Sequence, residues 1–357
     1  MAIQHMDNFS IYGTDKTLLL DGIYAEAGNG GDQGSVSLVA DPDGISSGYV
    51  FSINGGYGGG GAYTLLRYVL SSNQTTCGVA TRLWMPNLPP DTERKICPIQ
   101  WRDVSNNPLW SITVDTTGRL QLRTGNFDGT ILETTTSPVV TAAGWWHIEA
   151  KLLVNASGNI EVRVEGQTVI DHNLDSGSTA VSQVAVCNDP TSASASTTFY
   201  IKDFVVWDGS GSHNTSFLGS VIVTNLAVDS DVALNWTPST GTTGYGILDN
   251  VPPVDSEYIA APYPAPSAYQ GSLTALPNNI TSVKAVMTFV RAAKTDGGDG
   301  SLQTSVISNS ATANGADRPI TVAMTYWRDV FEVDPDTSAA WLPAAVDLAD
   351  IKLNRTV

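Results

Sequence analysis

Pairs of acidic residues with a spacing suited to glycoside hydrolysis occur in the middle of the chain. Glu161 and Glu165 are four positions apart, as are Asp171 and Asp175. On a strand such acids share a face, and hydrolysis of a glycosidic bond uses two carboxyl groups about 5–10 Å apart. Glu161 and Glu165, however, alternate with apolar residues in a regular hairpin, so both should face solvent. We therefore predict no catalytic residue and no enzyme activity.

Aromatic residues beside polar loops would indicate carbohydrate binding instead. The candidates are Tyr57, in a glycine-rich stretch, and three tryptophans in or next to predicted strands, Trp84, Trp101 and Trp110. Most tryptophans in a β-sandwich belong to the core, so packing is the alternative for each. The consecutive Trp145 and Trp146 must place one ring on each face of their strand, because successive strand side chains point to opposite faces.

Metal binding has weaker support in the sequence. The four histidines lie far apart and show no metal-ligand spacing, although His147 could support a hydrogen bond across a sheet. Asp41 with Asp43, and Asp296 with Asp299, are acid-rich turns of the kind that holds calcium through oxygen atoms. Turn formation alone explains these acids. We expect no cofactor, with calcium as the alternative.

Composition limits the classes of function. The chain has 357 residues, of which 42% are hydrophobic and 15% charged, with a formal net charge of −17 and a pI near 4.4. That apolar content is enough for a packed core, and the low charge is typical of turn-rich all-β proteins. A net charge of this sign repels the phosphate backbone, so nucleic acid is not an expected partner.

The cysteines and the hydropathy pattern indicate a protein folded in a cytoplasm. Cys77, Cys97 and Cys187 lie in or beside apolar strands, which favours buried thiols, although one disulfide between two of them remains open. No apolar run approaches the roughly 20 residues that cross a bilayer. The opening MAIQHMDNFSIYG lacks the basic and then apolar order of a signal peptide.

Residues 145–173 give the clearest fold signal. Their sequence reads as three consecutive antiparallel strands, with Ile148, Ala150 and Leu152 on one face of the first strand. In the second strand, Ile160 and Val162 alternate with charged residues. A meander with one apolar face needs a second sheet to cover it.

About a dozen short strands with turn signals between them fill the first 208 residues, and none shows sustained helical periodicity. Long strands joined by hairpins predict an all-β jelly roll of the concanavalin-A or laminin-G kind over residues 1–208. A small polar linker follows at 209–216. Residues 217–357 are predicted to form a smaller C-terminal β-sandwich, which begins with a strand at 217–226 and has a long turn-rich excursion at 229–266.

Three passages resemble a family of tailed-bacteriophage and prophage virion proteins. They are DNFSIYGT, YIKDFVVWDGSGSHNTSFLG and VALNWTPSTGTTGYGILDNVPPVDSEYI. The family pairs a laminin-G or concanavalin-A-like jelly roll with a smaller C-terminal β domain. Typical members carry two acids where this chain has Lys202 and Asp203, which argues against transferring a cation site. The family brings no catalytic residues to these positions.

The resemblance implies a non-enzymatic virion structural protein, such as a tail or head fibre, a decoration or a minor tail protein. It would be assembled in the host bacterial cytoplasm, would contact other virion proteins and itself, with a trimer as the first expectation, and would not insert into a membrane. The alternatives are a carbohydrate-binding module for host polysaccharide and, third, a glycan-degrading enzyme. A concave sheet lined with exposed aromatics would support the second, and a facing pair of buried acids the third.

Overall fold

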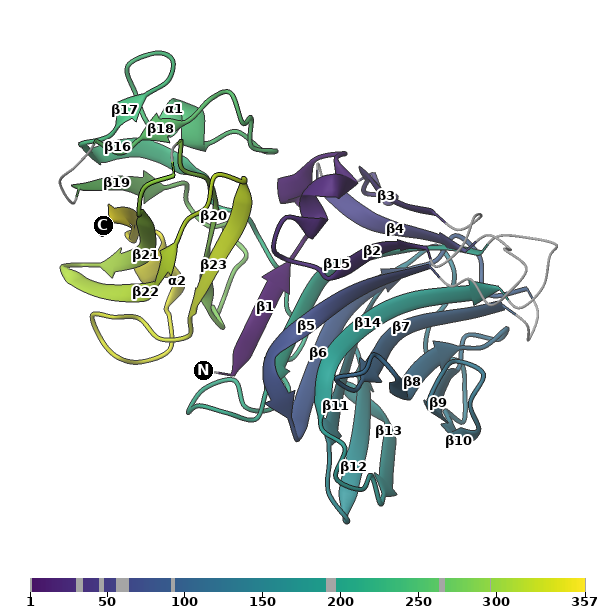
Figure 1. The fold of residues 1–357 in the computed structure, drawn as a ribbon. Helices are drawn as coiled ribbons and strands as arrows, with labels where there is room; N and C mark the ends of the chain where they lie inside the picture. Colours follow the sequence, from purple (N-terminus) through teal and green to yellow (C-terminus); the bar gives the residue numbers. More distant parts are fainter. Residues whose placement is uncertain are drawn as a thin grey trace. The chain divides into compact units, whose positions relative to one another are not determined.

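The computed structural model is almost entirely β-structure and forms two compact units (Figure 1). It describes residues 2–29, 35–44, 48–55, 64–90, 94–190, 197–262, 267–295 and 297–356. The first unit is Ala2–Val223 and the second begins at Thr224. Each unit has its own sheets and its own core, so each is described by itself. No described helix is long and apolar enough to span a membrane.

The first unit is a two-sheet sandwich, which confirms the predicted jelly roll. The larger sheet, named sheet A, has the order β13-β12-β11-β6-β15-β4-β3, and β1 pairs with β15. Its strands are β1 (Ile3–Asp7), β3 (Ser35–Ala40), β4 (Tyr49–Gly55), β6 (Thr76–Trp84), β11 (Trp145–Leu153), β12 (Gly158–Val164), β13 (Gln167–Leu174) and β15 (Thr197–Asp208). The predicted meander is thus β11-β12-β13, and the buried side chains of β12 alternate as expected.

The second sheet, named sheet B, has the order β10-β9-β8-β7-β14-β5-β2. Its strands are β2 (Glu26–Asn29), β5 (Thr64–Gln74), β7 (Arg94–Arg102), β8 (Pro108–Val114), β9 (Leu120–Thr124), β10 (Ile131–Thr134) and β14 (Val181–Pro190). Ile99, Ile112, Val162 and Ile201 are fully buried, so the apolar faces of both sheets form one core. The three cysteines are also buried, and none of them forms a disulfide.

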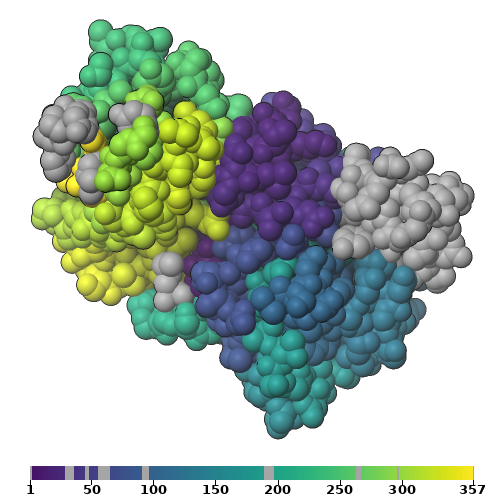
Figure 2. All heavy atoms as spheres, viewed as in Figure 1, coloured from purple at the N-terminus to yellow at the C-terminus, as the bar shows by residue number. Residues whose placement is uncertain are grey.

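The N-terminal strand is attached to the sandwich by a buried carboxylate. Tyr12 and Tyr24 each donate a hydroxyl hydrogen bond to Asp7 Oδ2, at 2.7 and 2.9 Å. The other oxygen, Oδ1, accepts the Phe9 N–H at 2.6 Å and holds Phe9 at a φ of 66°, a left-handed conformation that non-glycine residues rarely adopt. The 3-10 turns η1 (Ser10–Tyr12) and η2 (Lys16–Leu20) follow β1 in the chain. They belong to the N-terminal segment that lies at the surface of the unit, purple in Figure 2.

The second unit is a smaller β structure, in line with the sequence. Its main sheet has the order β16-β19-β24-β21-β22. The elements are β16 (Val228–Leu234), β17 (Thr237–Pro238), α1 (Tyr245–Leu248), β18 (Ile259–Ala260), β19 (Ser267–Leu273), β20 (Val286–Ala292), β21 (Ser301–Ser308), β22 (Ala311–Pro319), β23 (Thr325–Phe331), α2 (Pro343–Val346) and β24 (Asp350–Arg355).

A carboxylate also fixes the excursion predicted at 229–266. Asp231 accepts the N–H groups of Gly244 and Tyr245 and the hydroxyl of Tyr269, each at 2.8 Å. Burial and the neighbouring Asp231 raise the pKa of Tyr269. This acid therefore gives the excursion specific contacts with both α1 and β19.

The boundary between the units lies later than predicted. Residues 217–223 belong to the first unit, and residues 217–226 form no strand, because their backbone hydrogen-bonding groups meet side chains of sheet A rather than a neighbouring strand. The predicted linker at 209–216 therefore leads to a segment that returns across the jelly roll.

Replacing Asp7 with alanine should destabilise the first unit. The substitution leaves two buried tyrosine hydroxyls without their acceptor, and each such loss costs about 1–3 kcal/mol, so we expect the free energy of unfolding to fall by about 3 kcal/mol. Urea denaturation measures this change. Asp15→Ala is the matched control, because Asp15 only caps an exposed turn through Thr17. Equal destabilisation by both variants would contradict the proposed role of Asp7.

Candidate functional site

A row of aromatic side chains crosses the outer face of sheet A. Cross-strand pairing places Trp145 beside Trp84, Trp84 beside Tyr200 and Tyr200 beside Ser52, and the row ends at Ser37 on β3. The neighbouring residues in these strands face the core, so strand alternation directs the row outward. All three rings are half-buried. We call these five residues the aromatic row.

The rings of the aromatic row are held in fixed orientations. Trp84 and Tyr200 pack edge to face, with ring centroids 5.3 Å apart and planes at 66°. Trp145 donates its indole N–H to Asp41 Oδ1 at 3.1 Å, and Lys202 Nζ lies 4.2 Å from the centroid of its ring. A cation over an indole face is an attractive contact.

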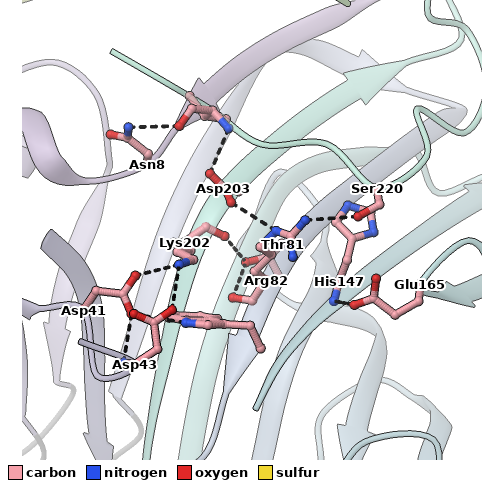
Figure 3. A network of polar contacts seen from close by, with 12 residues as sticks. Asn8, Asp41, Asp43, Thr81, Arg82, His147, Glu165, Lys202, Asp203 and Ser220 are labelled. Carbon is pink, nitrogen blue, oxygen red and sulfur yellow. Dashed lines mark hydrogen bonds and ion pairs between the residues drawn. The ribbon is translucent and has the colours of Figure 1, made fainter. Parts of the chain in front are cut away.

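Two residues further along the strands, a row of basic side chains runs parallel to the aromatic row. Arg82 lies opposite both His147 and Lys202 in the strand register. Figure 3 shows Lys202 between the two acids of the 41–44 turn, with Nζ 2.6 Å from Asp41 Oδ2 and 3.9 Å from Asp43 Oδ2. The lysine thus supplies the positive charge that a calcium ion would bring to these acids.

Arg82 connects this row to a strained acid. Its Nε lies 3.2 Å from Asp203 Oδ2, and its Nη2 donates to Ser220 Oγ at 3.1 Å. Asp203 has a φ of 53°, at a bulge where the register between β15 and β6 shifts. Burial raises the pKa of Asp203 to about 6, although a hydrogen bond from the Val223 N–H and the charge of Arg82 oppose that shift.

Residues 217–223, which we call the strap, lie over this network. Glu149 accepts the N–H of Leu218 at 2.5 Å and that of Gly219 at 3.2 Å, and Asp203 Oδ1 accepts that of Val223 at 2.8 Å. Asn8 donates to the Val223 carbonyl at 3.0 Å (Figure 3). The strap therefore gains from side-chain carboxylates the hydrogen bonds that a neighbouring strand would otherwise supply.

His147 is the least satisfied member of the site. It is 0% exposed, and among the described residues neither ring nitrogen has a hydrogen-bond partner. The sequence suggested a side-chain hydrogen bond across the sheet, but it is the backbone N–H that is bonded, to Glu165 Oε1 at 2.7 Å (Figure 3). Burial, followed by the charge of Arg82, lowers the pKa of His147 to about 4, so the ring is neutral at pH 7.

The outer face of sheet B also carries polar residues, but they bond to one another. Arg102 donates to Gln100 at 2.6 Å, Gln100 to Ser111 at 3.0 Å, and Arg123 to the Gly129 carbonyl at 3.0 Å. The side-chain-bearing residues of this set are between 0% and 8% exposed. These polar groups therefore satisfy one another, whereas the aromatic row of sheet A carries half-buried rings.

The four aromatic residues that the sequence suggested as glycan contacts have different surroundings in the structure. Trp84 belongs to the aromatic row. Trp101 and Trp110 are opposite each other in β7 and β8, 0% and 8% exposed, on the core side of sheet B. Trp101 and Trp110 therefore pack in the core and do not contact a glycan. Each lies two positions from a buried isoleucine, Ile99 or Ile112, and so points to the same face of its strand. Tyr57 lies outside the described residues.

The acidic candidates form no buried pair, although Glu161 and Asp171 lie opposite each other in β12 and β13 with Asp171 exposed. Glu161 bonds to Arg163 at 2.8 Å and Glu165 is exposed except for its bond to the His147 backbone. Asp171 accepts from Asn159 at 2.7 Å, and Asp175 accepts the N–H of Gly177 in a turn. Within the described part of the chain, no three His, Cys, Asp or Glu side chains gather in a group that could hold a metal. Of the second acid-rich turn, Asp296 lies outside that part.

Sequence reasoning did not identify Arg82 and Glu149, and it named Asp41, Lys202 and Asp203 without bringing them together. Asp41 follows β3, Glu149 lies on β11, and Lys202 and Asp203 lie on β15. One signal was present in the sequence. Lys202 and Asp203 are consecutive polar residues within an otherwise apolar strand, and a strand buried on both faces should not carry them without partners.

Comparison with known proteins gives structural matches only. Neither a protein-family profile nor a curated protein sequence matches this chain. The chain is similar to a cellulose-induced protein, Cip1, with a TM-score of 0.44 and 14% identity over 61% of this chain and 100% of that one. It is also similar to an endo-β-1,4-glucuronan lyase from the fungus Trichoderma reesei, with a TM-score of 0.41 and 13% identity over 58% of this chain and 95% of the lyase. A third match is the alginate lyase Aly36B, with a TM-score of 0.37 and 14% identity over 56% of this chain and 95% of the lyase.

These matches contradict the expected assignment to non-enzymatic virion structural proteins. Two of the three similar structures are glycan lyases, and none is described as a virion component. The expectation that the chain is not an enzyme is contradicted by the same finding. A likeness at 13–14% identity describes a fold and transfers no activity, so function has to be argued from the residues on sheet A.

The buried His147 predicts a defined pH dependence of stability. Its pKa falls from 6.5 to about 4 on folding, so the folded protein binds this proton more weakly than the unfolded chain. The contribution of the neutral ring is fully present above pH 6.5 and is lost as the pH falls from 6.5 to 4, by up to about 3 kcal/mol. Urea denaturation of the wild type and His147→Gln between pH 4 and 8 should show a difference that shrinks toward low pH. A constant difference would contradict the buried neutral ring.

Proposed function

We propose that the first unit binds a glycan chain on the outer face of sheet A. The observation that carries this proposal is the aromatic row, in which three half-buried rings on adjacent strands continue into serine hydroxyls. Half-buried aromatic rings offer apolar faces to the C–H surfaces of sugar rings, and their polar edges accommodate water and hydroxyl groups.

The geometry of the sheet sets the size of this platform. Adjacent strands lie about 4.8 Å apart, so the rings of Trp145, Trp84 and Tyr200 span roughly 10 Å across the sheet. Of the two serines that continue the register, Ser52 is buried and Ser37 is exposed. The three rings by themselves fit a short oligosaccharide segment lying across the strands.

Polar groups beside the rings can fix the orientation of the sugar. Asp43 and Lys202 have side chains that are 21% and 18% exposed, so both are within reach of a ligand on the row. Trp145 is already held by Asp41 and Lys202, and Trp84 by Tyr200. A surface whose rings are ordered before binding loses little side-chain entropy when the ligand arrives.

Removing single rings from the row should weaken glycan binding. Trp84→Ala and Tyr200→Ala each take away stacking area, so we expect each to weaken glycan binding at least tenfold, by about 1.4 kcal/mol or more. Affinity electrophoresis and titration calorimetry on a panel of polysaccharides measure the change. Thermal unfolding confirms that each variant is folded.

Tyr258→Ala is the matched control, because Tyr258 is an exposed aromatic residue, 47% accessible, in the second unit. It should bind as the wild type does. Binding that survives both row variants, or that is lost equally in the control, would refute the aromatic row as the site.

A second candidate function is cleavage of the bound glycan, and one observation favours it. Burial raises the pKa of Asp203 to about 6, so about a tenth of this carboxyl group is protonated at pH 7 and more at lower pH, as proton donation to a leaving group requires. Its Oδ1 accepts the Val223 N–H, so the strap must move before Asp203 can act.

Asp203→Asn tests cleavage separately from binding. If Asp203 donates the proton, the variant should release new chain ends at least a hundredfold more slowly than the wild type, because general acid catalysis typically contributes about 10²–10⁴-fold. Its glycan affinity should be unchanged. Release of reducing or unsaturated ends is the readout. A wild-type protein that releases none, or a variant as active as the wild type, would rule out this candidate.

A further inference from the structure

The charges around the aromatic row are predominantly negative. Nearest the row, two cations, Lys202 and Arg82, face a larger number of carboxylates, and the ring of His147 is neutral at pH 7. These carboxylates are Asp41, Asp43, Glu149, Glu165 and Asp203. Further along the same face, Arg163 pairs with Glu161, and Arg163 and Lys151 both lie over the ring of Phe217 in the strap. The whole chain carries a formal net charge of −17, so the long-range field has the same sign.

Lys202 is not available to an anionic ligand. Its ammonium group lies 2.6 Å from Asp41, whose side chain is 1% exposed, and it also covers the ring of Trp145. A ligand carboxylate that captured Lys202 would leave Asp41 buried without its counter-ion, which is strongly unfavourable. It would also release the Trp145 ring from the contact that orients it.

Arg82 is occupied in the same way. It is paired with Asp203, whose side chain is 6% exposed, and donates to Ser220 of the strap. An anion could take Arg82 only by leaving Asp203 unpaired beneath the strap. Among the described residues, neither of the two cations nearest the row is therefore available to a charged sugar.

The accessible groups instead suit hydroxyl donors. Asp43 is a partly exposed carboxylate, and Ser37 at the end of the row is exposed. A carboxylate accepts hydrogen bonds from sugar hydroxyls, and such charge-assisted bonds are stronger than neutral ones. We infer that the ligand of the aromatic row is a neutral polysaccharide and that polyuronides are excluded, an inference that rests on the proposed glycan-binding function.

The test compares neutral and acidic polysaccharides on the full chain. The neutral panel is hydroxyethyl cellulose, xylan, galactomannan and dextran, and the acidic panel is alginate and polygalacturonate. Binding is measured by affinity electrophoresis and calorimetry at 50 and 300 mM salt for the wild type, Trp84→Ala, Asp43→Asn and Asp128→Asn. The last variant is the charge-matched control, because Asp128 is exposed and lies in a loop next to sheet B.

The expected result is binding of at least one neutral polysaccharide that is lost in Trp84→Ala, with alginate and polygalacturonate at least tenfold weaker at both salt concentrations. Asp43→Asn should lower the affinity for the neutral polysaccharide and reduce the difference in affinity between neutral and acidic polysaccharides. Asp128→Asn should leave both quantities unchanged.

Two results would overturn the inference in different ways. Acidic polysaccharides that bind as tightly as neutral ones, and lose that binding in Trp84→Ala, would refute the neutral class while leaving the glycan site in place. No binding by either panel, or binding that Trp84→Ala leaves unchanged, would refute the proposed function itself and the inference with it.

Discussion

Buried carboxylates in an acidic chain must find donors, and this constraint organises the first unit. Asp7, Asp41, Glu149 and Asp203 are all largely buried, and a charged group removed from water is strongly destabilising unless it is paired and hydrogen-bonded. Donors from nearby in the sequence satisfy Asp7, and donors at least 20 residues away satisfy the other three. Tyrosine hydroxyls bind Asp7, Lys202 and Trp145 bind Asp41, and backbone N–H groups of the strap bind Glu149 and Asp203.

The aromatic row is a consequence of these pairings. Trp145 is oriented because Asp41 accepts its indole N–H and because Lys202, drawn to the same acid, covers its ring. The strap leaves the row open because its anchors, Glu149 and Asp203, lie further along the strands. Charge pairing thus divides the outer face of sheet A into a covered, polar part and a half-exposed, aromatic part.

His147 shows the cost of that arrangement. Its ring lies in the row of Arg82 and Lys202, where protonation would add a third positive charge in a buried position, so the ring stays neutral and without hydrogen bonds among the described residues. Asp203 carries a second cost, because its backbone adopts a left-handed conformation at the bulge. Unfavourable features of this kind persist where the surrounding structure fixes them, and they concentrate at functional sites.

Local patterns in the sequence determined the strands and the jelly roll, because alternation of apolar and charged residues, as in Ile160 to Val164, depends only on the two-residue period of a strand. The same patterns could place Trp84 on a strand but could not distinguish it from the buried Trp101, since both lie in apolar strands. The sequence of residues 217–226 likewise predicted a strand. The strap forms there instead because Glu149 and Asp203, both distant in the sequence, accept its backbone N–H groups. Only the tertiary structure decided which strand faces are exposed to water and which charged groups pair. Strand register and the strap bring together Asp41, Arg82, Glu149 and Lys202. No local sequence pattern encodes such long-range contacts.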